Sequence, residues 1–147
     1  MASLNTPRKS EGFLYPIPFV ELLGFNLVKF ENGLAEVKFD PLPEHLNTLD
    51  FIHGGVLMTL MDVAMAAAAR SIDPLLSVIT IEMKTTFMQP AIGKVITKGR
   101  LIYRTQSTAF LEASIFDINN KHCAHATGTF KYVHNKNQAN LKKPASN

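Results

Sequence analysis

The stretch "NTLDFIHGGVLMTLMDVAMAAAARS", residues 47–71, decides the fold. Between positions 56 and 69 every residue is apolar except Thr59 and Asp62. This composition predicts a helix over about residues 54–71. Because a helix that is apolar on all sides has to be covered on several sides, the rest of the chain is expected to wrap around it.

Turn and helix-end signals divide the remaining sequence. "PIPFVELLGF", residues 16–25, predicts a short helix that ends at Gly24. Asn32-Gly33 lies between two short apolar segments and predicts a tight hairpin. Residues 40–50 are rich in turn formers and predict a loop. Asp73-Pro74 ends the central helix, because a residue before proline avoids helical backbone angles.

Four strands are expected after the central helix, over residues 76–88, 93–104, 108–117 and 122–133. In the first of them apolar and polar residues alternate, which predicts a single apolar face. A run of strands with one long helix predicts an α+β fold in a single domain, with an antiparallel sheet wrapped around the helix. The apolar face of the first strand would consist of Ile79, Ile81, Met83 and Phe87.

Length and composition agree with one domain. The chain has 147 residues, of which 46% are hydrophobic, so it can build a single core. We assign the folded domain to residues 15–133, a flexible N-terminus to residues 1–14 and a flexible basic tail to residues 134–147.

The charge pattern and the composition limit the possible partners and the cellular location of the protein. The net charge is +3 and the pI is about 9.1, but no basic stripe is interleaved with aromatic residues, so no nucleic-acid partner is expected. A basic rim suits an anionic small ligand that bears phosphate. We expect no membrane association, because no apolar run reaches about 18 to 20 residues. The N-terminus lacks the apolar stretch of a secretory signal, and the single cysteine, Cys123, allows no intrachain disulfide, so a cytoplasmic protein is expected.

Two histidines raise the question of a metal site. His122 and His125 lie on the last expected strand, three residues apart. An odd separation places side chains on opposite faces of a strand, so we expect no shared metal.

Gly54 and Gly55 stand where the central helix begins. The first N–H groups of a helix have no partners within it, and the helix dipole is positive there. Glycine lets a ligand approach this backbone closely, which suits a carbonyl oxygen that gains negative charge during a reaction. Alternatively, the two glycines only make a tight turn.

Asp62 is the only carboxylate in the helix. A charge within an apolar helix surface is costly, so such a residue is usually paired or functional. A structural Asp that bonds a neighbouring loop or subunit is the alternative. Gly54 and Asp62 are eight residues apart, about 12 Å along a helix. If both serve one small reacting group, two subunits related by a twofold axis have to contribute to the site.

At these residues the sequence resembles the hotdog-fold acyl-CoA thioesterases of the phenylacetate-degradation type. The family pattern has an Asn, then His-Gly-Gly, then an acidic residue inside the central helix, followed by a strand with a hydroxyl residue, an acidic residue and an aromatic-Met-x-Pro ending. The resemblance covers about residues 15–133. Asp50 departs from it, since the family often has glycine there. The matching residues are Asn47, His53-Gly54-Gly55, Asp62, Thr80, Glu82 and Phe87-Met88-Gln89-Pro90.

The resemblance implies a fold, an assembly and a reaction. It implies a five- or six-stranded antiparallel sheet around the central helix, paired into homodimers and commonly into homotetramers. It implies hydrolysis of an acyl-CoA thioester without a cofactor, the CoA being part of the substrate. Asp62 would be the general base or the nucleophile, and the Gly54 N–H would hold the carbonyl oxygen. Asn47 would help to place the carbonyl or the water, and Thr80 would help to position the water or the base. His53 would be an orienting residue at the helix entry.

The candidates for substrate binding are chosen by their side chains, given the reaction that the resemblance implies. The phosphates of CoA would meet Arg104 in the turn region that also contains Ser107 and Thr108, although an ordinary polar turn explains these residues as well. The acyl pocket would lie between subunits near the helix and suit aryl or medium-chain groups. Core packing is the alternative for each apolar candidate. The candidates for this pocket are Phe51, Met58, Met61 and Met65, and Gly55 is a further substrate-binding candidate.

Two other functions remain open. A non-catalytic acyl-CoA-binding regulatory module would use the same fold, but binding alone does not require Asp62. An acyl-CoA lyase or hydratase would need an acid/base pair, to which Asp50 and His53 come nearest. Release of free thiol from an acyl-CoA discriminates these functions from a thioesterase.

Overall fold

The computed structural model describes residues 10–135 of the chain. Its elements follow in the order of a short helix, a hairpin, a loop with one 3-10 turn, the long helix and four strands, which confirms the expected order. Their bounds are α1 Pro18–Leu23, β1 Asn26–Glu31, β2 Leu34–Phe39, η1 Pro43–His45, α2 Gly54–Ile72, β3 Leu76–Phe87, β4 Val95–Arg104, β5 Thr108–Asp117 and β6 His122–His134.

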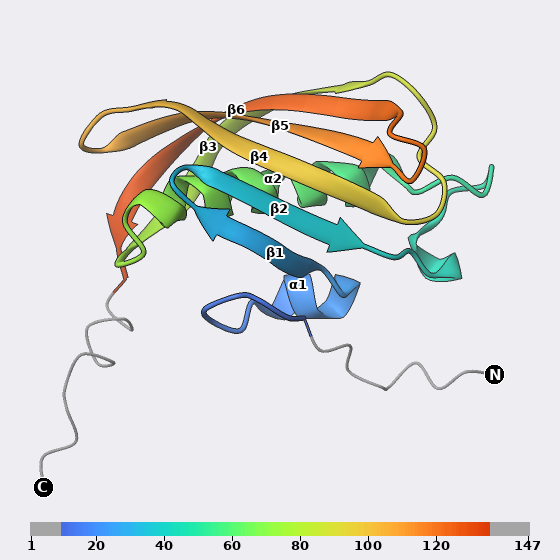
Figure 1. Ribbon diagram of the computed structural model, residues 1–147, viewed down its shortest axis with the longest axis horizontal. Helices are drawn as coiled ribbons and strands as arrows, with labels where there is room; N and C mark the ends of the chain where they lie inside the picture. Colours follow the sequence, from blue (N-terminus) through green and yellow to red (C-terminus); the bar gives the residue numbers. More distant parts are fainter. Residues whose placement is uncertain (1–9, 136–147) are drawn as a thin grey trace, which may run out of the picture.

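The six strands form one antiparallel sheet in the order β1-β2-β4-β5-β6-β3. The sheet curves around α2, and α1 lies beside β1 (Figure 1). The predicted α+β fold with a sheet around one central helix is therefore confirmed. β1 and β3 are the edge strands, and β3 follows α2 directly in sequence.

The first helix and the first hairpin end and turn at the residues that the sequence predicted. α1 stops at Gly24, which adopts a left-handed φ of 81°. Asn32 and Gly33 both have positive φ, 50° and 80°, as the tight hairpin between β1 and β2 requires. The Gly33 N–H donates to the hydroxyl of Ser71 at 2.8 Å, and this bond ties the tip of the hairpin to the last turn of α2.

Small residues let α2 approach the sheet. A Cβ on Gly99 of β4 would lie 2.5 Å from the Ala64 carbonyl oxygen, so only glycine fits there. The helix then buries apolar side chains against the sheet, and each buried leucine or methionine among them stabilises the fold by about 2 kcal/mol. The buried residues of α2 are Leu57, Leu60, Met61, Ala64, Met65, Ala67, Ala68 and Ala69.

α2 has 19 residues and, by length and composition alone, is long and apolar enough to cross a membrane. The sequence expectation that no segment reaches this length was therefore wrong. In the fold, however, α2 is the core helix beneath the sheet (Figure 1), and the core helix of a soluble domain passes the same test.

The single apolar face expected for β3 is not found. Thr80 pairs with Phe130 and Glu82 pairs with Thr129, so Ile81 is an extra residue in a β-bulge. As a result, the residues before the bulge lie on the opposite faces of the sheet from those predicted. Thr80 points toward α2, whereas Ile79 lies on the outer side of the sheet and is 57% exposed. Period-two alternation predicted the wrong faces because it assumes an unbroken strand.

The chain ends fall largely outside the described residues. Within them, the Ser10 hydroxyl donates to the Val20 carbonyl at 3.0 Å, and the Leu27 N–H donates to the Glu11 carbonyl at 2.9 Å. Residues 10 and 11 are therefore held against α1 and β1. Of the predicted flexible ends, residues 1–9 and 136–147 lie outside the residues that the structure describes.

Candidate active site

The first turn of α2 leaves one backbone donor free. The Gly55 N–H donates to Nδ1 of His53 at 2.9 Å, so the histidine side chain caps the helix. The N–H groups of Val56 and Leu57 donate to the His53 carbonyl at 2.9 and 3.2 Å. Of the four N–H groups that begin the helix, only that of Gly54 has no partner within residues 10–135. His53 thus accepts hydrogen bonds from the N–H groups of residues 55–57 and leaves only the Gly54 N–H for a ligand oxygen.

Asn47 shapes the loop that leads into α2. Its Oδ1 accepts from the N–H groups of Leu49 and Phe51 at 2.9 and 3.2 Å, and its own N–H donates to the Phe51 carbonyl at 2.8 Å. Asp50, between them, has a φ of 61°. Glycine favours this left-handed conformation and Asp tolerates it. The departure from the family pattern at Asp50 therefore fits the turn that a glycine would make.

Asp62 is held by β3. The hydroxyl of Thr80 donates to Asp62 Oδ1 at 2.6 Å, and the carboxylate remains partly exposed. The expected association of these two residues is present in the structure, and it depends on the bulge that turns Thr80 toward the helix. The other carboxylate oxygen, Oδ2, has no hydrogen-bond partner among the described residues.

Gly54, Met58 and Asp62 follow one another at intervals of four residues along one side of α2. The spacing predicts about 12 Å between the first and the last along the helix axis. Within one chain, the free N–H and the held carboxylate are therefore too far apart to contact one small reacting group.

β3 runs alongside this row in the opposite direction. At its end, the tip of the Phe87 ring meets Gly54: a Cβ on Gly54 would lie 3.4 Å from Phe87 Cζ. Phe87 is 50% exposed and Met58 is 37% exposed. We did not single out Phe87 as a site residue from sequence, although the aromatic-Met-x-Pro ending of the strand was the signal that could have identified it.

The other pocket candidates differ in exposure. Phe51 is half-buried in the loop, and Gly55 is exposed at the helix start. Met61 and Met65 are fully buried at 0% exposure and fill the core, with Met65 packed against Gly128 of β6. Among the three predicted methionines, only Met58 reaches the surface of the single chain.

The residues considered for CoA lie at the turn between β4 and β5. The Arg104 guanidinium stacks on the Tyr132 ring, with 4.3 Å between its Cζ and the ring centre. The N–H groups of Ser107 and Thr108 donate to Thr105 Oγ1 at 3.3 and 3.0 Å. Thr108 pairs with Lys131 of β6, and Lys131 pairs with Ile79 of β3, the residue before Thr80. Two strand spacings therefore separate the turn from β3, so the turn lies about 10 Å across the sheet from the Asp62 end of the site.

Tyr132 anchors this region. Its hydroxyl donates to the Ala69 carbonyl in the last part of α2 at 2.9 Å. Burial raises the pKa of the Tyr132 phenol, and the nearby Arg104 cation partly offsets this by favouring the phenolate.

The sequence itself now identifies the family. Residues 49–124, more than half of the chain, match the family described as "Thioesterase superfamily". The chain belongs to the thioesterase superfamily. A protein of Archaeoglobus fulgidus named "Putative esterase" is 31% identical to this thioesterase over 111 residues, which cover 74% of this chain and 71% of the relative.

Solved structures agree with this assignment. A conserved protein of Pseudomonas aeruginosa, PA5202, matches with a TM-score of 0.77 and 28% identity, over 80% of this thioesterase and 95% of that chain. The phenylacetic acid degradation protein PaaI from Thermus thermophilus matches with a TM-score of 0.71 and 25% identity, over 78% and 98% of the two chains. The fold also matches smu.793 from Streptococcus mutans bound to acetyl CoA, with a TM-score of 0.68 and 23% identity, over 75% and 89%.

These findings confirm the resemblance stated from sequence. The protein is a hotdog-fold thioesterase of the PaaI type. The expected hydrolysis of thioesters is confirmed at the level of the family.

Two hollows of the thioesterase surface lie away from these residues. One, of about 270 Å³, is on the outer face of the sheet and is lined in part by Lys98, Arg100 and Ser114. The other, of about 340 Å³, lies where β2 and β5 end and β4 begins, and is lined in part by Lys38 and Asp117. Neither is lined by Gly54 or Asp62. We assign the site from the free N–H and the held carboxylate, because neither hollow is lined by the first residue of a helix, whose N–H could hold a thioester oxygen.

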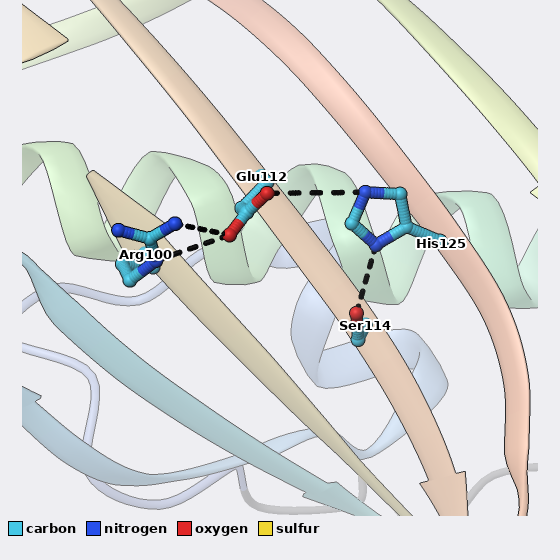
Figure 2. Close-up of polar contacts among 4 residues, drawn as sticks. All are labelled: Arg100, Glu112, Ser114 and His125. Atoms are coloured by element: carbon cyan, nitrogen blue, oxygen red, sulfur yellow. Dashed lines mark hydrogen bonds and ion pairs between the residues drawn. The ribbon is translucent and has the colours of Figure 1, made fainter. Parts of the chain in front are cut away.

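A polar cluster beside the first hollow resembles a nucleophile-base-acid relay (Figure 2). Ser114 Oγ lies 2.8 Å from His125 Nδ1, and His125 Nε2 lies 4.0 Å from Glu112, which Arg100 also binds. β5 is paired with β4 and β6 along this region, so its backbone N–H groups are engaged in the sheet. Because no backbone donors remain for an oxyanion, this cluster is better explained as side-chain pairing on an exposed sheet face.

The expectation that His122 and His125 lie on opposite faces was wrong. Ile115 pairs with Ala124 and Phe116 pairs with His122, so Cys123 is an extra residue in a bulge. Both imidazoles therefore lie on the outer face, with ring centres 5.9 Å apart. Residues 10–135 contain no group of three or more His, Cys, Asp or Glu that could hold a metal ion.

Proposed function

We propose that this thioesterase hydrolyses the thioester of an aryl- or medium-chain acyl-CoA at a site shared between two subunits. The observation that carries the proposal is the pair of groups on one side of α2. A single free N–H begins the helix at Gly54, and a carboxylate held by Thr80 follows two turns later at Asp62. A helix N-terminus suits a developing oxyanion, and a held carboxylate suits a base or a nucleophile.

The reaction uses these groups in defined roles. The Gly54 N–H donates to the thioester carbonyl oxygen, and the amide of Asn47 helps to place it. Asp62 takes a proton from water while the water oxygen attacks the carbonyl carbon. The carbon–sulfur bond then breaks, and the thiolate of CoA receives the proton from Asp62. If Asp62 instead attacks directly, a mixed anhydride forms and water hydrolyses it. A thioester is electrophilic enough that neither route needs a metal or a cofactor.

The distance along α2 and the exposed edge of β3 support the proposal of a shared site. Ile79 and Ile81 are 57% and 58% exposed on this edge strand. A long edge strand with exposed apolar residues is suited to pairing with another strand. Pairing of two β3 strands about a twofold axis would set the helices antiparallel and bring Gly54 of one subunit toward Asp62 of the partner subunit. We propose a homodimer of this kind, which can pair further into a homotetramer.

Substrate contacts complete the proposal. The structural neighbour from Streptococcus mutans holds acetyl CoA, which supports CoA esters as the substrate class. Arg104, with Ser107 and Thr108, would meet CoA phosphates at the turn near the Asp62 end. Phe51, Gly55 and Met58 would contact the substrate between subunits, whereas Met61 and Met65 would support the pocket from the core. We place the protein in the cytoplasm, where CoA esters are formed and used.

A complementation experiment tests the shared site. Pro is tolerated in the first helical position, and the ψ of His53, 137°, lies outside the helical region that a following proline disfavours. Gly54→Pro therefore removes the N–H with little disturbance of α2, and we expect kcat to fall about 100- to 1000-fold. Asp62→Asn removes the base. Each homodimer is inactive, but mixed dimers regain one complete site.

The recovered activity distinguishes a site shared between two subunits from a site within one chain. Random exchange of equal amounts of the two variants should restore about a quarter of wild-type activity per chain. No recovery, with mixed dimers shown by native mass spectrometry, would place the whole site within one chain.

The alternative, a non-catalytic acyl-CoA-binding module, is tested by thiol release. We expect wild-type protein to release thiol from at least one of phenylacetyl-, hydroxybenzoyl-, hexanoyl- and palmitoyl-CoA, and Asp62→Asn to release none. Tight binding of these esters without thiol release would favour the binding module. Equal release by both proteins would make Asp62 structural.

A further inference from the structure

The ring of Phe87 lies beside the proposed oxyanion donor. Its Cζ is 3.4 Å from the position that a Gly54 Cβ would occupy. That position and the Gly54 nitrogen are both one bond from the Gly54 Cα. Phe87 Cζ therefore lies within about 6 Å of the Gly54 nitrogen. Half of the Phe87 side chain is nevertheless exposed. The residue therefore adjoins the reacting centre and keeps a surface that a ligand can contact.

A thioester bound at the Gly54 N–H would bring its acyl group to this ring. Its carbonyl oxygen would lie about 3 Å from the Gly54 nitrogen, so the first carbons of the acyl chain fall within reach of Phe87. Met58 is one helical turn along the same side of α2 and is 37% exposed. A phenyl face and a thioether both form favourable contacts with an aromatic ring.

Within the proposed thioesterase reaction, on which the inference depends, we infer that Phe87 determines the acyl preference. It selects a flat ring attached close to the thioester over a flexible alkyl chain. An aromatic pair adds about 2- to 12-fold in affinity beyond the area that it buries. An alkyl chain lacks this contribution and loses rotational freedom when it is held.

The test compares phenylacetyl-CoA with hexanoyl-CoA for three proteins: wild type, Phe87→Leu and Phe110→Leu. Phe110 is a matched control, since it is 41% exposed on the outer face of β5. We expect wild type to prefer phenylacetyl-CoA in kcat/KM. Phe87→Leu should lower kcat/KM for phenylacetyl-CoA about 5- to 10-fold and change that for hexanoyl-CoA less than about twofold. Phe110→Leu should keep the wild-type ratio.

A ratio unchanged in Phe87→Leu, or an equal loss for both esters, would overturn the role of Phe87. A wild-type preference for hexanoyl-CoA would overturn it as well. Calorimetric binding of the two esters to Asp62→Asn, with and without Phe87→Leu, separates selectivity from chemistry. If wild type releases no thiol but the binding preference is lost with Phe87→Leu, the hydrolysis proposal fails and the role of Phe87 is supported. If neither hydrolysis nor binding distinguishes the esters, the inference is wrong.

Discussion

Thr80 on β3 donates a hydrogen bond of 2.6 Å to Asp62 on α2, across 18 positions of sequence. A bulge between Thr80 and Glu82 makes this contact possible, because it turns the threonine to the helix side of the sheet. The hydroxyl restricts the carboxylate to one orientation and leaves its Oδ2 for a water or a thioester carbon. A single irregularity in the edge strand thus positions the group proposed to do the chemistry.

Thr80→Val should impair turnover more than binding. Valine keeps the shape and the β-branching of the side chain but removes the donor, so Asp62 becomes free to rotate. We expect kcat to fall about 10- to 100-fold with KM within about threefold of wild type, as measured by steady-state thiol release. Thr129→Val is the matched control, since Thr129 makes the same kind of bond to Glu82 at 2.7 Å on the outer face. Equal effects of the two variants would argue that Thr80 serves stability alone.

Ile81→Lys should separate the proposed subunits. Ile81 is 58% exposed in the bulge of the edge strand, and a lysine there opposes pairing of strand edges. We expect a folded monomer by analytical ultracentrifugation and a loss of kcat/KM of about 100-fold or more. Ile102→Lys, at a 50% exposed bulge residue of the central strand β4, should leave β3 pairing and turnover intact. An active monomer would contradict the shared site.

Asp50 should tolerate glycine but not a β-branched residue. Its φ of 61° is open to Gly and Asp, whereas valine there is strained. Asp50→Gly should change the free energy of unfolding by less than about 0.5 kcal/mol, because relief of strain offsets the greater freedom of the unfolded chain. Asp50→Val should lower it by about 1 to 2 kcal/mol. Urea denaturation measures both, and near-wild-type stability of Asp50→Val would show that the loop adopts another conformation.

Tyr132→Phe should destabilise the protein by an amount that depends on pH. Loss of the bond to the Ala69 carbonyl should lower the free energy of unfolding by about 1 kcal/mol at pH 7. Burial raises the Tyr132 pKa above its ordinary value of 10.0, so the folded state favours the neutral phenol. This contribution to stability is complete below pH 10 and is lost as pH rises through the raised pKa. Denaturation curves from pH 7 to 11 should show the two proteins converging, and a constant gap would contradict the assignment.

Much of the fold could be read from short segments. Asn32-Gly33 predicted the first hairpin, Gly24 predicted the end of α1, and the apolar run predicted α2, because each signal depends on local backbone preferences. The spacing of Gly54 and Asp62 predicted the separation along one helix, since the rise of a helix is constant. The motif residues then led to the family, which the sequence comparison confirmed.

The face of a side chain in an irregular strand could not be read in this way. The bulges at Ile81 and Cys123 arise from pairing with strands distant in sequence, and each one exchanged the faces that alternation predicted. As a result, Ile79 lies on the outer face, and His122 and His125 lie side by side. The sequence also did not predict which methionines of α2 are exposed. Met58 and Met61 are alike in sequence but differ in what covers them.

The sequence by itself determined the helix, the glycines at its start, the carboxylate within it and the family. These depend on residue identity and on spacing along one element, which the local chain geometry sets. Only the tertiary structure decided which partners these groups acquire: Thr80 for Asp62, His53 for the neighbours of Gly54, and Phe87 at the helix start. Such contacts join segments that meet only when the sheet closes around α2, and their geometry follows from the packing of the whole domain.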